Sequence, residues 1–213
     1  PGTDIIAETS QAGSTAPRVR RTLYGRELES AGPDAATLLA YDGFGRAVSR
    51  TVTNAAGTVS TTAVVYDTLG NAVTNETTYG SLTAVTATGY DSQGRAVSQT
   101  DALGNAIFTA YDRAGNVTAQ WGATYPVAYT YDTAGRRISM RTFRDENDDG
   151  DETRWEYDHA TGLLTNKVYA DGSCVRYAYT PSGLLASRVW ARGITASYAY
   201  DALGQLTNVH YSG

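Results

Sequence analysis

YTYDTAGRRIS (residues 129–139) contains the motif that decides the fold, because Tyr-Asp, two variable residues and a glycine recur along the chain. Eight tyrosines follow one another at intervals of 20 to 26 residues: Tyr41, Tyr66, Tyr90, Tyr111, Tyr131, Tyr157, Tyr179 and Tyr200. Seven of the eight precede an aspartate. A period of this length is typical of repeat proteins, in which each repeat is one small structural unit.

The motif is complete in six of these copies and altered in two. The complete copies are Tyr41, Asp42 and Gly45; Tyr66, Asp67 and Gly70; Tyr90, Asp91 and Gly94; Tyr111, Asp112 and Gly115; Tyr131, Asp132 and Gly135; and Tyr200, Asp201 and Gly204. Asp101 to Gly104 has the same spacing without the tyrosine. YDHATGL, from Tyr157, is one residue longer, and YTPSGLL, from Tyr179, has Thr180 in place of the aspartate.

Asp-x-x-Gly predicts a chain reversal, since the aspartate bonds the backbone two residues on and the glycine accepts the positive φ that follows a type I turn. The flanking residues alternate as in strands, for example Tyr129 with Tyr131 and Tyr198 with Tyr200. Further glycines lie between the motifs and predict the opposite hairpin ends, most clearly Asp171-Gly172. The fold class is therefore all-β, an antiparallel array of β-hairpin repeats.

The array is expected to cover residues 19–213 as about nine repeats in one domain. Residues 1–18 are small and polar and lack the alternation, so they are predicted to be irregular or a truncated strand. The chain begins without methionine, and we expect it to be a piece of a longer protein.

Composition argues against several classes of partner. The formal net charge of −5 offers no field that attracts nucleic acid or an anionic membrane. No apolar run is long enough to cross a membrane as a helix, and no signal peptide is visible. The single cysteine, Cys174, excludes an internal disulfide. Stability must then come from packing and backbone pairing.

The six motifs YDGFGR, YDTLGN, YDSQGR, YDRAGN, YDTAGR and YDALGQ, at this spacing, resemble the YD repeats of the Rhs family. Relatives are bacterial Rhs and wall-associated polymorphic toxins, the shell component of insecticidal toxin complexes, and the teneurins. The resemblance implies a spiral sheet that is a segment of a hollow shell. It also implies a secreted or cell-surface location, with the rest of the parent polypeptide and an enclosed effector domain as partners.

Two departures from the family limit what can be carried over. No Asp-Pro occurs in the chain, so the self-cleavage of the toxin families is not expected. About nine repeats are also too few to close a shell, and the open strand edges of such a fragment favour edge-to-edge self-association.

The repeated aspartates are not predicted to be catalytic, because catalytic carboxylates work in pairs whose environments differ. Turn chemistry already explains their positions. His159, His210 and Cys174 stand alone and form no recognisable nucleophilic or zinc motif. An enzyme is therefore not predicted.

DENDDGDETRWE (residues 145–156) is the one stretch with chemical content. Asp145, Asn147, Asp149 and Glu156 match positions 1, 3, 5 and 12 of the D-x-[DN]-x-[DN]-G-x5-E calcium pattern. Helices do not flank it, so an EF-hand is excluded. Related calcium loops at hairpin ends lack the terminal glutamate and would use Asp151 as a backbone ligand together with residues near 153. The alternative is a solvated acidic hairpin tip. Calcium is the only candidate cofactor.

Two functions follow. The first is a non-enzymatic wall segment of a shell that carries a toxin or effector. The second is an extracellular adhesion module that binds carbohydrate or a cell-surface protein through sheet faces rich in tyrosine and tryptophan, including Trp121 and Trp190.

Overall fold

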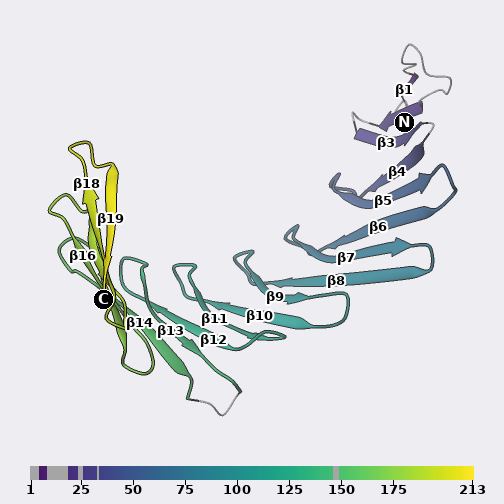
Figure 1. Cartoon of the computed structure of the whole chain (residues 1–213). Helices are drawn as coiled ribbons and strands as arrows, with labels where there is room; N and C mark the ends of the chain where they lie inside the picture. Colours follow the sequence, from purple (N-terminus) through teal and green to yellow (C-terminus); the bar gives the residue numbers. More distant parts are fainter. Residues whose placement is uncertain (1–4, 9–18, 24–25, 33, 146–148) are drawn as a thin grey trace. The chain divides into compact units, whose positions relative to one another are not determined.

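The computed structural model describes residues 5–8, 19–23, 26–32, 34–145 and 149–213, and it assigns nineteen strands and no helix to them. The chain divides into two compact units, residues 1–108 and residues 109–213. Each unit is an antiparallel array in which a strand pairs with the strand that follows it in the sequence (Figure 1). The predicted all-β hairpin array is confirmed.

In the first unit the strands have four to nine residues. They are β1 (Ile5–Glu8), β2 (Val19–Leu23), β3 (Arg26–Ala31), β4 (Ala35–Tyr41), β5 (Ala47–Asn54), β6 (Val59–Tyr66), β7 (Ala72–Tyr79), β8 (Leu82–Tyr90) and β9 (Ala96–Thr100). β1 pairs with β2, so the sheet begins at Ile5, before the predicted start of the array at residue 19. β10 (Ala106–Tyr111) begins in this unit and pairs with β9.

The second unit repeats the same arrangement. Its strands are β11 (Val117–Gly122), β12 (Val127–Tyr131), β13 (Arg137–Thr142), β14 (Asp151–Tyr157), β15 (Leu164–Val168), β16 (Cys174–Tyr179), β17 (Leu185–Val189), β18 (Thr195–Tyr200) and β19 (Leu206–Ser212). β19 pairs with β18, and no other strand of the second unit pairs with it, so it is an edge strand of that unit.

A register shift recurs at the tyrosine of the repeat. Ala40 lies opposite Ser49, whereas Tyr41 lies opposite Ala47, so the strand after the turn carries one extra residue. The same shift precedes Tyr66, Tyr90, Tyr131, Tyr157, Tyr179 and Tyr200. A β-bulge at this place is therefore part of the repeat, and it strengthens the local right-handed twist.

Three of the opposite hairpin ends, at Gly57, Gly172 and Gly193, use the same kind of turn, whereas two residues join β7 and β8 at Gly80. At Asp171-Gly172 the N–H of Gly172 donates to the carbonyl of Tyr169 (3.0 Å), and Gly172 has a φ of 80°. Glycine is thus the fourth residue of a four-residue turn that ends in a bulge, and the Asp-Gly pair is not the centre of a two-residue turn. The hairpin is where the sequence predicts it, with a different turn geometry.

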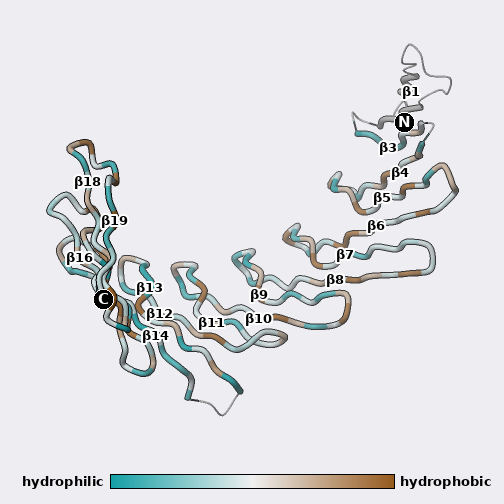
Figure 2. Tube along the Cα trace, viewed as in Figure 1, coloured by the Kyte–Doolittle hydropathy of each residue, from teal (hydrophilic) through white to brown (hydrophobic). Residues whose placement is uncertain are grey.

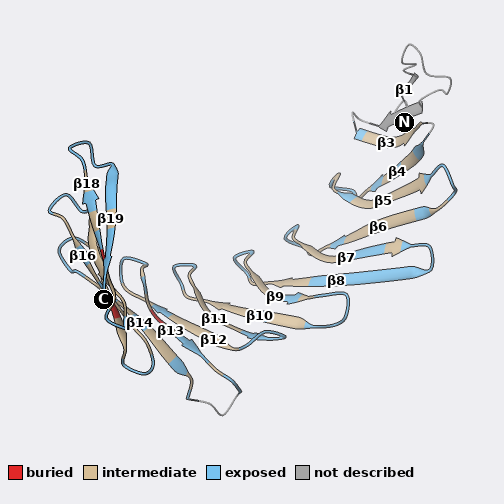
Figure 3. Ribbon diagram, viewed as in Figure 1, coloured by how far each residue is buried: buried red, intermediate tan, exposed pale blue. Residues whose placement is uncertain are grey.

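Each unit is a single layer with little core. Among the described residues only Val175 (2% exposed) and Ala196 (0%) are buried hydrophobic residues, with Ser139 (9%) as the buried polar one. Figure 3 marks these few places in red, and Figure 2 shows hydrophobic and hydrophilic residues alternating along the strands. Stability must come mainly from backbone pairing and from contacts between neighbouring side chains on one face.

One such face in the second unit is covered by rings and cations. Lys167 lies opposite Val175 and Arg188 opposite Ala196, so the long side chains share the face of the two buried residues. The Lys167 ammonium is 4.8 Å from the ring of Tyr169, and the Arg188 guanidinium is 4.8 Å from the ring of Trp190. These amphipathic side chains bury their stems over the small residues, which replaces a second layer.

Candidate functional site

The complete turn is a closed set of hydrogen bonds around one carboxylate. In the turn of Asp42, Oδ1 accepts the backbone N–H groups of Phe44 and Arg46, both at 2.9 Å, and Oδ2 accepts Nε–H of Arg46 at 2.7 Å. The N–H of Gly45 donates to the Asp42 carbonyl at 2.9 Å, with a φ of 78° at the glycine. The aspartate thus fixes both the backbone and the side chain that follows the glycine.

At this last position arginine and asparagine donate to the same carboxylate oxygen. Arg95 and Arg136 bond Oδ2 of their aspartates as Arg46 does, each at 2.7 Å. Asn71, Asn105 and Asn116 donate Nδ2–H to the same oxygen, at 2.8 to 2.9 Å. Both side chains present an N–H at the right reach, which explains why the repeat alternates between them.

In six copies the tyrosine links its repeat to the one before it. Its hydroxyl donates to a backbone carbonyl across about 14 to 20 residues: Tyr41 to Glu27, Tyr66 to Ala47, Tyr90 to Ala72, Tyr131 to Val117, Tyr157 to Arg137 and Tyr200 to Leu185. The distances are 2.8 to 3.2 Å. Sequence reasoning missed this role, because periodic tyrosines also suit a sheet face and the acceptor carries no sequence signal.

The arginine completes the link from the other side. The Arg46 guanidinium lies 4.4 Å from the ring of Tyr66, and that of Arg136 lies 4.5 Å from the ring of Tyr157. A guanidinium therefore sits between the carboxylate of its own turn and the ring of the next repeat. Together these contacts form a ladder along one end of the strands. We call it the turn ladder: the Tyr, Asp and Gly of the complete copies, with the Arg or Asn that follows the glycine in all of them except the Tyr200 copy, which has Gln205.

Hydrogen bonds to the carboxylates lower their pKa values. Backbone and side-chain donors of Arg136 lower the pKa of Asp132, and the side-chain amide of Asn71 lowers that of Asp67. The pKa of Asp158 is lowered chiefly by the hydroxyl of Thr161. The carboxylates of the turns are thus charged at neutral pH.

Two consecutive turns depart from this pattern. In the turn of Asp158, which is one residue longer, the N–H of Asp158 donates to the carbonyl of Leu163, so Leu163 takes the place of the arginine. In the next turn Thr180 replaces the aspartate and Leu184 takes the arginine's place; Thr180 Oγ1 accepts the Leu184 N–H at 3.0 Å. The Tyr179 hydroxyl between them makes no hydrogen bond within the described part of the chain.

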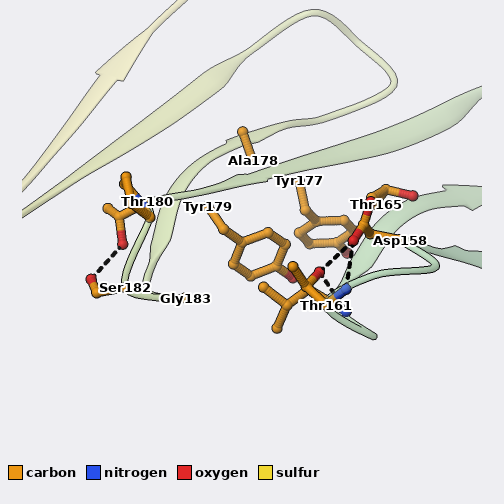
Figure 4. Close-up of a pocket in the computed structure, with 11 residues that line it drawn as sticks. Asp158, Thr161, Thr165, Tyr177, Ala178, Tyr179, Thr180, Ser182 and Gly183 are labelled. Atoms are coloured by element: carbon orange, nitrogen blue, oxygen red, sulfur yellow. Dashed lines mark hydrogen bonds between the residues drawn. The ribbon is translucent and has the colours of Figure 1, made fainter.

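A pocket of about 610 Å³ opens between these two altered turns (Figure 4). Asp158, Thr161 and Leu163 form one wall, and Tyr177, Tyr179 and Ser182 contribute to the other. Burial and the neighbouring Tyr177 raise the pKa of the Tyr179 phenol, which therefore stays protonated at neutral pH. Only the extra residue of YDHATGL and the missing aspartate of YTPSGLL could have indicated this place from the sequence.

The acidic stretch lies at the hairpin end between β13 and β14. Arg144 pairs with Asp151 at 3.1 Å, and Arg141 donates to the carbonyl of Asp149 at 3.4 Å. Gly150 has a φ of 76° and lies against Arg141 and Phe143, where a Cβ would collide. Asn147 lies outside the described residues. The described residues contain no group of three or more potential metal ligands, and the calcium site stays a prediction.

Glu156 lies apart from the other predicted calcium ligands. It belongs to β14, five residues after Asp151, and accepts Nδ2–H of Asn166 at 2.7 Å. Five residues along a strand span about 16 Å, and an odd separation places the two side chains on opposite faces. A metal bound at the hairpin end would have to use Asp145, Asn147, Asp149 and Asp151.

Cys174 and the tryptophans of the predicted aromatic surface lie on strands or beside turns. Cys174, at the start of β16, is a half-buried free thiol. Trp121 is 43% exposed, whereas the ring of Trp190 stacks on that of Tyr211 at 6.1 Å. No described residues form a helix of the length and hydropathy that crossing a membrane requires.

The geometry places the chain in the class of single-layered β-hairpin repeat proteins. Comparison with known protein families identifies the type of repeat. Residues 90–120 match the family described as RHS Repeat, which confirms the predicted resemblance to the Rhs/YD-repeat family for a segment that contains Tyr90, Asp91 and Gly94. No curated protein sequence matches the chain.

Solved structures show that the likeness in fold extends over most of the chain. The crystal structure of TcdB2-TccC3-Cdc42 is similar with a TM-score of 0.57 and 18% identity, over 91% of this chain and 13% of that one. The crystal structure of TcdB2-TccC3 gives a TM-score of 0.55 and 18% identity, over 91% of this chain and 14% of that one. The chain thus corresponds in length to a small part of these proteins.

Proposed function

We propose that the chain is a wall segment of a β-shell that belongs to a larger, secreted toxin-like protein and encloses an effector domain. The observation that carries the proposal is the turn ladder, which binds the repeats with a complete motif to their neighbours in a single layer. A ladder of this kind adds repeats without requiring a second layer, as a wall does. The RHS match over residues 90–120 and the likeness to part of TcdB2-TccC3 support it.

The single layer suits a wall, and the carboxylates of its complete turns lack the unlike environments that acid and base catalysis requires. Carboxylates of the complete turns are paired with neighbouring N–H groups and serve the backbone. Repetition gives each of them the same environment, whereas acid and base catalysis needs unlike ones. The proposal therefore assigns a structural function to the repeats.

Protease protection in the full-length parent protein tests the shell. We expect the part outside the repeat array to resist trypsin in the native protein and to be cleaved once urea unfolds the array. Equal cleavage of that part before and after unfolding of the array would contradict enclosure. The native protein serves as its own control, so the test does not depend on a variant that folds.

Adhesion through the aromatic residues is the competing outcome. Tyr125 (79% exposed) offers an accessible ring, and Tyr211 (64%) is exposed as well although its ring stacks on that of Trp190. Binding of the isolated chain to a glycan array, lost in Tyr211→Ala or Trp121→Ala, would favour a recognition module. A chain that binds no glycan and associates through its β19 edge, with association weakened in Asn208→Lys, is what the wall predicts.

A further inference from the structure

The altered turn of Asp158 keeps the groups that surround a guanidinium elsewhere in the chain but lacks the guanidinium. In the preceding repeat the Arg136 side chain lies between the Asp132 carboxylate, at 2.7 Å, and the ring of Tyr157, at 4.5 Å. The corresponding groups of the next repeat are Asp158 and Tyr179. Leu163 stands where the arginine would be.

The carboxylate of Asp158 has one oxygen available. Oδ1 accepts the N–H of Ala160 and both the N–H and the hydroxyl of Thr161. Oδ2, the atom that bonds arginine or asparagine in the complete turns, accepts no hydrogen bond from the described residues. The nearby cation Arg136 is held by Asp132 and donates to the carbonyl of Gly162. His159, the residue next to Asp158, lies at the exposed tip of the turn.

The ring of Tyr179 is likewise without a cation. Tyr66 and Tyr157 each lie under the arginine of the preceding turn, whereas no described cation lies over Tyr179. Figure 4 shows the rings of Tyr177 and Tyr179 directed toward the turn that contains Asp158 and Thr161. Asp158 and Tyr179 both line the pocket of about 610 Å³, which has room for a side chain that comes from outside the repeat.

We propose that this pocket binds the guanidinium group of an arginine side chain from another polypeptide segment, which takes the place that Arg46 and Arg136 occupy in their own repeats. Oδ2 of Asp158 would accept N–H groups, and the ring of Tyr179 would lie against the cation. A planar guanidinium suits both contacts better than an ammonium does, because it can bond a carboxylate and stack on a ring together. The proposal does not depend on the shell function.

The neighbouring pocket shows why the aspartate matters. A pocket of about 460 Å³ between the next two turns is lined by Thr180, Leu184 and Tyr200, and there too a leucine stands in the arginine's place. Its turn has Thr180 instead of an aspartate, so the corresponding carboxylate is missing. Asp201 also lines this second pocket, but it belongs to the following turn, where its Oδ1 accepts the N–H groups of Leu203 and Gln205. The second pocket therefore serves for comparison, because it lacks a carboxylate at the position that Asp158 occupies in the first.

Titration of the 213-residue chain with N-acetyl-L-arginine methylamide, followed by NMR, tests the proposal. We expect saturable shifts of the amide signals of Thr161 and Tyr179. The uncharged isostere N-acetyl-L-citrulline methylamide should bind about tenfold more weakly or not at all, because it lacks the charge that the carboxylate and ring recognise. Equal binding of the two compounds, or no shifts with arginine, would overturn it.

Two variants make the test independent of the turn's folding. Leu163→Arg supplies the missing guanidinium from within the chain and should abolish binding while leaving the turn intact. Leu184→Arg adds the same charge at the neighbouring pocket, whose turn has Thr180 in place of the aspartate, and should leave binding at the Asp158 pocket unchanged. If Leu163→Arg still bound arginine with undiminished affinity, the cradle of Asp158 and Tyr179 would not be the site.

Discussion

The turns of Asp132 and Asp158 follow one another in the second unit, yet only the first keeps the whole pattern. Both reverse the chain with a glycine at positive φ, 76° at Gly135 and 74° at Gly162. Only Asp132 holds an arginine that reaches the next tyrosine. The comparison teaches that closing the turn and joining the repeats are separable, because the backbone turn survives when the joining arginine is lost.

Lowering the pH should destabilise turns that contain a carboxylate more than turns that lack one. We expect this to be the largest effect on stability, because many turns are affected at once. The pKa is lowered in the fold for the aspartates Asp42, Asp67, Asp91, Asp101, Asp112, Asp132, Asp158 and Asp171. A lowered folded pKa means that the unfolded chain binds protons first as the pH falls. Stability should be constant above about pH 5 and fall steadily below about pH 4.

Urea unfolding between pH 7 and pH 3 measures this loss, and amide hydrogen exchange locates it. After correction for the intrinsic rate, protection of the Gly135 N–H, in the Asp132 turn, should fall at a higher pH than that of the Gly183 N–H, in the Thr180 turn. An unfolding midpoint that stays constant down to pH 3 would contradict the role assigned to the carboxylates.

Removing one turn side chain is the next largest change. Asp132→Ala removes acceptors for the N–H groups of Ala134 and Arg136 and for the Arg136 guanidinium, and we expect it to lower the melting temperature by about 5 °C. Thr180→Ala removes only the neutral bonds to Leu184 and Ser182 and should cost about 2 °C. Thermal denaturation followed by circular dichroism measures both; equal losses would show that the charge adds nothing.

The tyrosine hydroxyls allow the same comparison between repeats. Tyr131→Phe deletes the 2.8 Å hydrogen bond to the carbonyl of Val117, which leaves that acceptor without its partner and should cost about 1 kcal/mol. Tyr179→Phe deletes a hydroxyl that bonds no described residue and should change stability by less than about 0.5 kcal/mol. Urea denaturation of the two variants checks the difference, and an equal loss in both would refute the proposed link between repeats.

The acidic hairpin end between β13 and β14 is another departure from the regular repeat, and calcium should have the smallest effect. Asp151 is paired with Arg144, which competes with a metal, so we expect millimolar calcium to stabilise the chain by about 1 kcal/mol or less. Isothermal titration and thermal melts measure it. Asp149→Asn should reduce the effect, whereas Asp171→Asn, at another hairpin end, should not. Absence of both heat and stabilisation would dismiss the calcium site.

Much of the fold could be predicted because its signals are local. Asp42 and Gly45 specify a turn through bonds within four residues, and the alternation around Tyr129 and Tyr131 specifies a strand. The pairing of successive strands follows, since hairpins join neighbours in the sequence. The four-residue geometry at Asp171-Gly172 could not be chosen from the Asp-Gly pair, because two turn types accept that pair.

The site was less predictable because its parts come from different repeats. Calcium spacing in residues 145–156 suggests ligands that converge, yet Glu156 is held in β14 and bonds Asn166. The pocket of Asp158 and Tyr179 exists because an arginine is missing at position 163, and the length change in that turn hides the substitution from a residue count. A sequence motif points to side chains that are present, so it does not reveal a site that is formed by the absence of an arginine.

The repeat, its hairpins and the absence of a regular helical pattern follow from the sequence alone, since a turn and a strand depend on residues a few positions apart. The contacts that a side chain makes with a neighbouring repeat follow from the tertiary structure and not from the sequence pattern. The hydroxyl of Tyr157 reaches the carbonyl of Arg137, and the guanidinium of Arg136 covers the ring of Tyr157. Such contacts depend on the register between strands, because a shift of one residue would turn each side chain to the other face.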